Sequence, residues 1–408
     1  MKVIFISGGL PTEVLDEYNE KYAKHKTRNI QQWWDYTFAK SLCKACGNDD
    51  FFAISFPPVS TFPSSKCLYH KQKEIIGEDG LKIFVPKTWN LPVIKQRNLS
   101  SAIYKAIKKI AKKFPNEDIV ILTHCIYLQS AKPACKACKK FKNVKMCTIV
   151  PDLPEHLTGN ALTGNKLLHK LFDRYTKMTL PYKYKFDGYV CFSKWQMEYL
   201  NKEKPFIVME GFMDSTLFDK VESIKFEKPR IVYAGGVDLR YGIKELVDGF
   251  IASGISDGEL WIYGNGDGES YVKDKTDKGV FYGGVVSREE MLKIEKSADL
   301  LVNPRPTTDE FSRCSFPSKL MEYMASGTPT LTSRLGCIEE EYFDKMNFIE
   351  EVNESGVKDG LLAVWCDREK AKEKAKNTVK FIREYKSADY QAQKVYEFLE
   401  REFKQNDI

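Results

Sequence analysis

Residues 311–327 carry the pattern best suited to binding a phosphate, because a loop rich in serine and proline runs directly into a short helical pattern. Pro317 stands where a helix loses least from a missing N–H, and Gly327 ends the pattern. The first N–H groups of a helix have no acceptor within it, so they attract anions. We therefore expect a diphosphate cradle here, formed by Ser315, Phe316, Ser318 and Lys319.

Glu322 follows one turn inside the same helical pattern and is the residue best suited to binding a ribose. Leu320 and Met324 belong to the apolar side of this helix, which leaves Glu322 on another face. A carboxylate there can accept hydrogen bonds from both hydroxyls of a ribose whose diphosphate lies at the helix start. The alternative interpretation is a surface ion pair between Glu322 and Lys319, three residues apart.

Two glycine-rich turns earlier in the chain each follow a short apolar run that resembles a strand. Gly235 and Gly236 come first, and glycine lets a backbone approach a ligand closely. Arg240 follows and can supply positive charge to a diphosphate, although a tight turn with a solvated arginine is the alternative. The second turn begins at Gly264 with Gly-x-Gly-x-Gly spacing, which is not the dinucleotide fingerprint. A later strand end, near Val285, offers backbone to a base.

Parallel sheets must hold these turns at one edge. Short apolar runs alternate with longer amphipathic stretches, which indicates an α/β fold with helices on both faces of each sheet. The expected helices include Asn29–Cys43, Lys244–Ala252, Ser287–Ser297 and Pro317–Ala325. The expected strands are Lys2–Ser7, Phe51–Ser55, Asp118–Thr123, Lys145–Val150, Gly188–Phe192, Arg230–Ala234, Glu259–Tyr263, Gly279–Phe281, Leu300–Asn303 and Thr330–Thr332.

The series of strands restarts near Arg230, which predicts two Rossmann-like domains. We place the first at residues 1–210 and the second at residues 211–387, and we expect the last helix, 388–405, to pack back on the first. Ligands of open parallel sheets bind beyond the carboxyl ends of the strands. Two facing domains of this kind therefore predict a central interdomain cleft as the active site.

The composition is that of a globular chain of 408 residues, with 43% hydrophobic residues. No stretch approaches the ~20 apolar residues that cross a bilayer, and the apolar start is too short for a secretory signal, so we expect a cytoplasmic protein. The sequence contains two Cys-x-x-Cys pairs, Cys43/Cys46 and Cys135/Cys138. Such pairs bind zinc in other proteins. Both lie in helix-like stretches, which favours small buried side chains over a metal site.

The net charge of +7 is unevenly placed along the chain. Residues 101–114 combine five lysines with apolar residues at helical spacing, and residues 166–185 form a second basic and aromatic stretch. The first pattern is typical either of a solvated helix face or of a surface that contacts anionic lipid headgroups at the inner face of the cell membrane. No nucleic-acid motif accompanies the charge, so we expect no nucleic-acid partner.

The order of these segments resembles the retaining glycosyltransferase family 4, whose members have the GT-B fold of two facing Rossmann-like domains. The resemblance is clearest over residues 230–333, and Phe316-Pro-Ser-Lys-Leu-Met-Glu-Tyr-Met-Ala-Ser-Gly resembles a branch common among bacterial polysaccharide enzymes. It implies that Gly235 lies at the donor diphosphate, that Val285 lies beside the base, and that Glu322 binds the ribose.

Two departures from the family pattern affect the expected donor site. The first of the family's two glutamates falls on Cys314, so Glu310 on the same loop is a candidate substitute. The family's usual arginine after the first glycine is Gly236 here. Positive charge would then come from Arg240, or else from Arg305.

In the first domain, many family members place a histidine after a strand near the reacting sugar. The matching strand leads here into Asp152, which becomes a catalytic candidate together with His124 at the end of the preceding strand. A lone histidine at a strand end is also common as a structural residue. Gly9 resembles the family's glycine loop, and the segment 29–34 either lines the acceptor site or packs core tryptophans.

Taken with the resemblance, the residues predict a glycosyltransferase that moves a sugar from a nucleotide-diphosphate sugar to a hydroxyl of a saccharide or lipid-linked saccharide, with retention, in polysaccharide or glycoconjugate biosynthesis. No Asp-x-Asp motif occurs, so we expect neither a metal nor another cofactor, and a diphosphate held by N–H groups and basic side chains. A nucleotide-sugar 2-epimerase of the same fold and a non-catalytic nucleotide-binding scaffold are the alternatives.

Overall fold

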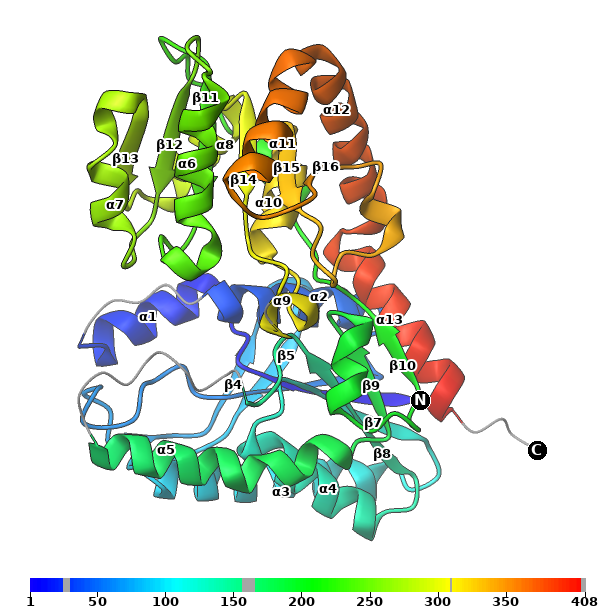
Figure 1. Cartoon of the computed structure of the whole chain (residues 1–408). Helices are drawn as coiled ribbons and strands as arrows, with labels where there is room; N and C mark the ends of the chain where they lie inside the picture. The colour runs from blue at the N-terminus through cyan, green and yellow to red at the C-terminus, as the bar shows by residue number, and fades with distance from the viewer. Residues whose placement is uncertain (25–29, 156–165, 309, 405–408) are drawn as a thin grey trace. The chain divides into compact units, whose positions relative to one another are not determined.

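The computed structural model describes residues 1–24, 30–155, 166–308 and 310–404, and it contains two compact units (Figure 1). Unit 1 comprises Met1–Met209 and Ala388–Ile408, and unit 2 comprises Glu210–Ser387. The chain therefore leaves unit 1 once and returns to it with its last helix.

Unit 1 is built on an eight-stranded sheet in the order β10-β9-β8-β7-β1-β2-β5-β4. All neighbours are parallel except β4, which runs antiparallel to β5 at the sheet edge. The two central strands, β1 and β7, are buried throughout and consist of near-continuous apolar runs, as strands covered on both faces do. The strands are β1 (Lys2–Ser7), β2 (Phe51–Ser55), β4 (Lys73–Ile76), β5 (Lys82–Val85), β7 (Ile119–His124), β8 (Val144–Val150), β9 (Gly188–Cys191) and β10 (Phe206–Val208).

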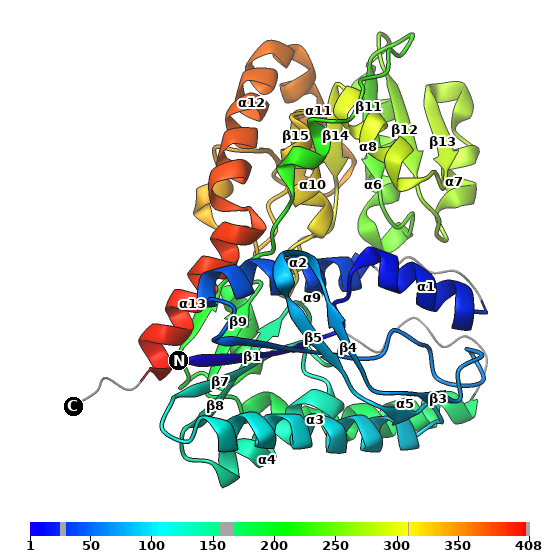
Figure 2. The same ribbon diagram turned by 180° about the vertical axis from the view of Figure 1, so that it is seen from behind.

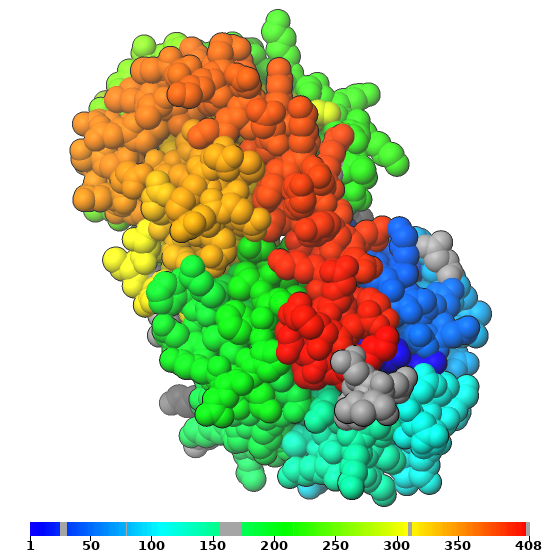
Figure 3. All heavy atoms as spheres, turned by 90° about the vertical axis from the view of Figure 1, so that its right-hand side faces the viewer, coloured from blue at the N-terminus to red at the C-terminus, as the bar shows by residue number. Residues whose placement is uncertain are grey.

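Helices cover both faces of this sheet (Figures 1 and 2). On one side lie α1 (Thr12–Tyr22) and α2 (Ile30–Cys46), and on the other α3 (Ile94–Lys113), α4 (Leu128–Lys140) and α5 (Lys166–Thr179). The C-terminal helix α13 (Ala388–Phe403) packs on α2, and the Lys394 ammonium donates to the Val208 carbonyl at 2.9 Å. Figure 3 shows α13, in red, with early (blue) and middle (green) segments of unit 1 on either side.

Unit 2 has a six-stranded, fully parallel sheet in the order β13-β12-β11-β14-β15-β16. Two apolar clusters cover its faces, one including residues of α8, α10 and α12 and the other residues of α6 and α11. The strands are β11 (Arg230–Ala234), β12 (Glu259–Tyr263), β13 (Val280–Gly284), β14 (Leu300–Asn303), β15 (Thr330–Ser333) and β16 (Asn347–Ile349). The helices are α6 (Ile243–Ser253), α7 (Glu269–Lys273), α8 (Arg288–Ser297), α9 (Glu310–Cys314), α10 (Ser318–Ser326), α11 (Glu354–Cys366) and α12 (Arg368–Tyr385).

The α/β class is confirmed, and each of the ten expected strands corresponds to a strand of the structure. The prediction missed six short strands: β4, β5, β10, β16 and the separate antiparallel pair β3 (Tyr69–His70) and β6 (Thr88–Trp89). These strands have two to four residues, and β4 is largely exposed, so they lack the buried apolar run that identifies a strand in a sequence. Within the described ranges, no helix is long and apolar enough to cross a membrane.

Candidate functional site

The turns after β11 and β12 pack backbone against backbone, which explains the alternating glycines. A Cβ on Gly264, whose φ is +128°, would lie 1.8 Å from the carbonyl oxygen of Gly235. A Cβ on Gly266 would lie 2.4 Å from the Val237 carbonyl, and Gly268 is similarly crowded by the same carbonyl. These glycines therefore have a structural reason to be glycine, and the expected donor contact of Gly264 stays a prediction.

The loop after β11 gathers positive charge around Tyr241. The Arg240 guanidinium donates to the Tyr241 hydroxyl at 2.9 Å and lies 4.8 Å from the centre of its ring. The guanidinium of Arg305, from the loop after β14, lies 5.6 Å from the same ring. Gly236 is crowded by this tyrosine, since an added Cβ would lie 3.1 Å from its Cε2. The two arginines that the sequence offered as alternatives thus lie at one site.

Helix α10 begins at Ser318 without a side-chain cap; of its first N–H groups, that of Leu320 donates to the Pro317 carbonyl at 2.9 Å. Its other end is the left-handed Gly327, with φ of +79°. Phe316 is buried and packs on the Tyr342 ring, with ring centres 5.4 Å apart. Of the expected cradle, Phe316 can therefore offer a ligand its backbone, whereas Ser318 is exposed.

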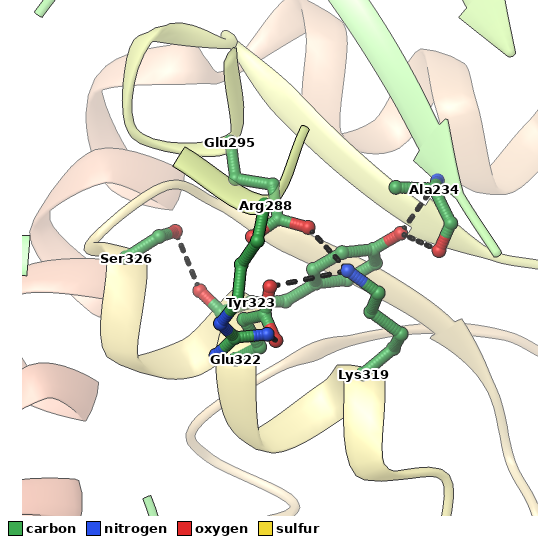
Figure 4. A network of polar contacts seen from close by, with 7 residues as sticks. All are labelled: Ala234, Arg288, Glu295, Lys319, Glu322, Tyr323 and Ser326. Atoms are coloured by element: carbon green, nitrogen blue, oxygen red, sulfur yellow. Dashed lines mark hydrogen bonds and ion pairs between the residues drawn. The ribbon is translucent and has the colours of Figure 1, made fainter. Parts of the chain in front are cut away.

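Glu322 lies in a buried ionic network between α8 and α10 (Figure 4). The Lys319 ammonium donates to Glu322 Oε1 at 3.1 Å and to Glu295 Oε1 at 2.9 Å. The Arg288 guanidinium donates to Glu322 Oε2 at 3.4 Å. The ion pair between Glu322 and Lys319 therefore forms, but the alternative of a surface pair is wrong, because the Glu322 side chain is only 9% exposed.

The network holds Glu322 as a carboxylate. Burial acts against the charge of Glu322, yet the Lys319 ammonium, a hydrogen bond from Glu295 and the Arg288 guanidinium hold its pKa below the usual value. Burial raises the pKa of Glu295 to about 8, since that side chain has no exposed surface. Glu322 is thus the ionised member of the pair, which suits an acceptor of ribose hydroxyls.

Tyr323 joins the Glu322 helix to the glycine turn after β11. Its hydroxyl accepts from the Ala234 N–H at 2.8 Å and donates to the Ala234 carbonyl at 3.2 Å (Figure 4). Ala234 is the last residue of β11 and directly precedes Gly235. Residues 89 positions apart in sequence are therefore brought to one edge of the sheet in unit 2.

The end of β13 presents the residue expected beside the base. Val285 directly follows β13, and its side chain is 73% exposed. Gly283, two residues before it, is pressed against Tyr263, since an added Cβ would lie 2.1 Å from the Cε1 of that ring. The exposed Val285 thus stands on a strand end whose backbone is held by packing.

In unit 1, His124 lies at the end of β7 in contact with a carboxylate that the sequence interpretation missed. His124 Nδ1 is paired with Asp35 Oδ1, and the Gly8 N–H donates to Asp35 Oδ2 at 2.6 Å. Trp34 stacks on the imidazole with ring centres 4.5 Å apart. Cys125, the next residue, has a φ of +63°, a strained conformation for a side chain other than glycine. Asp35 therefore links the glycine loop to His124.

The remaining candidate residues from the sequence are Gly9, Asp152 and Glu310. Gly9 is packed on α2, because an added Cβ would lie 2.5 Å from the Tyr36 backbone nitrogen. Asp152 is half-buried after β8, in unit 1 like His124. Glu310 begins α9, but its side chain lies outside the part of the chain that the structure describes.

Three charged residues beside the expected sites were not predicted: Asp35, Arg288 and Glu295. Asp35 directly follows the segment 29–34 that was considered, and its packing between β7 and the glycine loop has no sequence signal. Arg288 and Glu295 lie on the expected helix α8, where they resemble ordinary polar positions. Both Cys-x-x-Cys pairs lie in helices, as expected, and the described side chains contain no group of three or more metal-ligating residues.

Residues 228–372, most of unit 2, match the family model described as Glycosyl transferases group 1. A comparison with curated protein sequences finds no match. The match places the glycine turn, the two arginines and Glu322 within a recognised glycosyltransferase segment.

Solved structures similar to the whole chain include sucrose-phosphate synthase from Thermosynechococcus elongatus, at 15% identity, a TM-score of 0.62 and 99% coverage of both chains. The Anabaena protein HepE in complex with UDP follows at 12% identity, a TM-score of 0.57 and coverage of 98% of this chain and 100% of that one. The catalytic domain of starch synthase IV from Arabidopsis thaliana, bound to ADP and acarbose, has 10% identity, a TM-score of 0.58 and 99% coverage of both. The expected two-domain, Rossmann-like GT-B fold is confirmed, and together with the family match it supports a glycosyltransferase.

Proposed function

We propose that this protein transfers a glycosyl group from a nucleotide-diphosphate sugar to a hydroxyl of a saccharide or lipid-linked saccharide. The observation that carries the proposal is the buried, ionised Glu322, joined through Tyr323 to the glycine turn after β11, within the segment that matches a glycosyltransferase family. The UDP and ADP in two of the similar structures support a nucleotide as the bound part of the donor.

Each donor residue has a role that follows from its chemistry. Glu322 accepts the two ribose hydroxyls, and the N–H groups at the start of α10 face the diphosphate. Arg240 and Arg305, both beside Tyr241, neutralise the charge that grows on the diphosphate as the sugar leaves. Val285 and the end of β13 lie along the base. We propose that these groups suffice without a metal.

The finer assignments rest on the resemblance to glycosyltransferase family 4. We propose membership of this retaining family, with transfer to the same face of the anomeric carbon that the nucleotide leaves. Asp152 and His124, both in unit 1, are the candidate catalytic residues, and Glu310 at the start of α9 is the third candidate. The pairing of His124 with Asp35 supports His124, because it orients the imidazole at a strand end.

A groove in unit 1 supports the proposal of a lipid-linked acceptor, because its lining suits a membrane surface. This groove, of about 1070 Å³, lies between α3 and the strands β2, β5 and β4 and is lined by Lys105, Lys109 and Lys113 of α3 as well as by aromatic residues. Trp89, which also lines the groove, is 53% exposed. Lysines beside exposed aromatic side chains suit an anionic membrane surface. We therefore propose a cytoplasmic protein that contacts the inner face of the membrane during polysaccharide or glycoconjugate synthesis.

The donor site is tested by thermal shift with a panel of nucleoside diphosphates and their sugars, with and without magnesium. A ligand at a hundred times its Kd stabilises the folded protein by about 2.7 kcal/mol, which moves Tm by several degrees. We expect one base to give this shift without magnesium, and Glu322→Ala to abolish it. Glu289→Gln is the matched control, because Glu289 is an exposed glutamate on neighbouring α8. No shift with any nucleotide would contradict the proposal.

Transfer itself is tested by incubating the identified donor with and without saccharide or lipid-linked acceptors. Release of the nucleoside diphosphate that depends on an acceptor supports a transferase. Conversion of the donor sugar without an acceptor would indicate a 2-epimerase, and nucleotide binding without any turnover would indicate a scaffold. Glu322→Ala should reduce transfer at least about tenfold, since it removes charge-assisted hydrogen bonds to the donor.

A further inference from the structure

A second glutamate, Glu295, lies behind Glu322 with no exposed surface, although glutamate is rarely fully buried. It projects from α8 toward α10, where the Lys319 ammonium bridges the two carboxyl groups (Figure 4). Its other oxygen, Oε2, has no hydrogen-bond donor among the described residues. A fully buried charge with one unsatisfied oxygen is costly, so this arrangement requires an explanation.

We propose that Glu295 is a positioning residue of the nucleotide site, which together with Lys319 holds the Glu322 carboxylate in the orientation that receives the two ribose hydroxyls. The inference rests on the proposed function. Glu295 does not touch the nucleotide in this proposal and acts only through Glu322.

A proton on Glu295 resolves its unsatisfied oxygen. Protonated Glu295 accepts from Lys319 through Oε1 and donates its O–H to Glu322, whereas two carboxylates would have no proton to share and would repel. Burial, which raises the pKa of Glu295 to about 8, supports the protonated form at neutral pH. Neutral Glu295 therefore donates a hydrogen bond to the ionised Glu322 from its buried side.

The remaining neighbours fix Glu322 from the other directions. Arg288, on the same helix as Glu295, contacts Oε2 of Glu322 at 3.4 Å and is 40% exposed. Tyr323 is held by Ala234, and burial keeps its pKa well above the usual range, so it stays neutral alongside Glu295. Glu322 thus has Lys319 and Glu295 on its buried side and Arg288 on its open side, which leaves lone pairs for the ribose.

Nucleotide binding by the full chain tests this role without an identified acceptor. We would titrate UDP and ADP calorimetrically between pH 6.5 and 9 into the wild type, Glu295→Gln and Glu295→Leu. A glutamine reproduces the neutral acid, since its oxygen accepts from Lys319 and its amide donates to Glu322. Glu289→Gln, which removes an exposed glutamate of the same helix, is the control.

We expect wild-type affinity to be constant near neutral pH and to fall as Glu295 loses its proton at the alkaline end. Glu295→Gln should match the wild type at pH 7 and lack the alkaline fall, and Glu295→Leu should bind at least tenfold more weakly at all pH values. If Glu295 only stabilised the fold, the Glu295→Gln variant would not keep the nucleotide affinity of the wild type at pH 7 and at the same time lose its pH dependence.

Two results would overturn the inference: a parallel alkaline fall in Glu295→Gln, or an affinity of Glu295→Leu within twofold of wild type. If Glu295→Leu does not fold, the comparison of wild type with Glu295→Gln still decides. Failure of the wild type to bind UDP, ADP and every other nucleotide of the thermal-shift panel would instead overturn the proposed function. Loss of binding in Glu322→Ala with full binding in Glu295→Leu would overturn this inference alone.

Discussion

The two points at which the chain enters and leaves unit 2 are joined by a buried ion pair. Glu210 Oε2 lies 3.1 Å from the Lys386 ammonium, and both side chains are 2% exposed. The Met213 N–H also donates to the Lys386 carbonyl at 2.9 Å. A second carboxylate, Glu341, contacts the same ammonium at 2.6 Å but is 45% exposed. Removal of Glu210 should therefore destabilise unit 2 much more than removal of Glu341.

The magnitude follows from what each substitution leaves behind. Breaking a buried pair by removing one partner costs about 3–5 kcal/mol, because the remaining charge stays out of water. Glu341 still pairs with Lys386 in Glu210→Ala, so we expect the lower end, about 3 kcal/mol, or a fall in Tm of roughly 6–12 °C for a domain of this size. Glu341→Ala removes a half-exposed partner and should cost at most about 1 kcal/mol.

Differential scanning calorimetry of the full chain measures both variants, at low and high salt. The effect of Glu210→Ala should persist at high salt, since buried pairs are screened little. The double variant Glu210→Leu/Lys386→Met removes both charges and should recover most of the loss. If Glu210→Ala costs no more than Glu341→Ala, the reasoning from burial is refuted.

Three further predictions concern the turn after β12, the buried acid and the basic helix. Gly264→Ala should destabilise the fold by well over the ~1–2 kcal/mol expected for the control Gly254→Ala. Both glycines have positive φ, but only a Cβ added at Gly264 would lie 1.8 Å from a carbonyl oxygen. Equal losses of stability in urea unfolding would contradict this close approach. Glu295, with a pKa raised by burial to about 8 against the usual 4.5, binds a proton in the folded chain and not in the unfolded chain between these values. The protonated Glu295 therefore contributes stability that is lost as pH rises from about 4.5 to about 8, by at most about 1.4 kcal/mol per pH unit. Glu295→Gln should flatten the dependence of Tm on pH over this range. Neutralising three lysines of α3 should weaken binding to phosphatidylglycerol vesicles, measured by sedimentation, on the order of a hundredfold, at about 1 kcal/mol per lysine. Neutralising three exposed lysines of α12 should change this binding little. Equal effects of the two sets would place the membrane contact elsewhere. The α3 set is Lys105, Lys109 and Lys113, and the α12 control set is Lys372, Lys376 and Lys380.

The architecture could largely be predicted from the sequence because its signals are local. Strands such as Ile119–His124 and Leu300–Asn303 are buried on both faces, so a short apolar run is sufficient to identify them. Glu322 and the start of its helix were also recognisable, because proline, glycine and helical spacing occur within one segment. Short strands such as Lys73–Ile76 were missed because they pair at an edge and bury little apolar surface.

The tertiary structure decided which charges act together. Glu295 and Lys319 are 24 residues apart, and Asp35 and His124 are 89 apart, so neither pair has a spacing that a sequence pattern can detect. Their significance comes from packing, which removes water and leaves each charge dependent on a specific partner. The sequence by itself determined the parallel sheets, the glycine turns and the position of Glu322. Only the packing of α8 on α10 decided that Glu322 is buried, ionised and supported by a second acid.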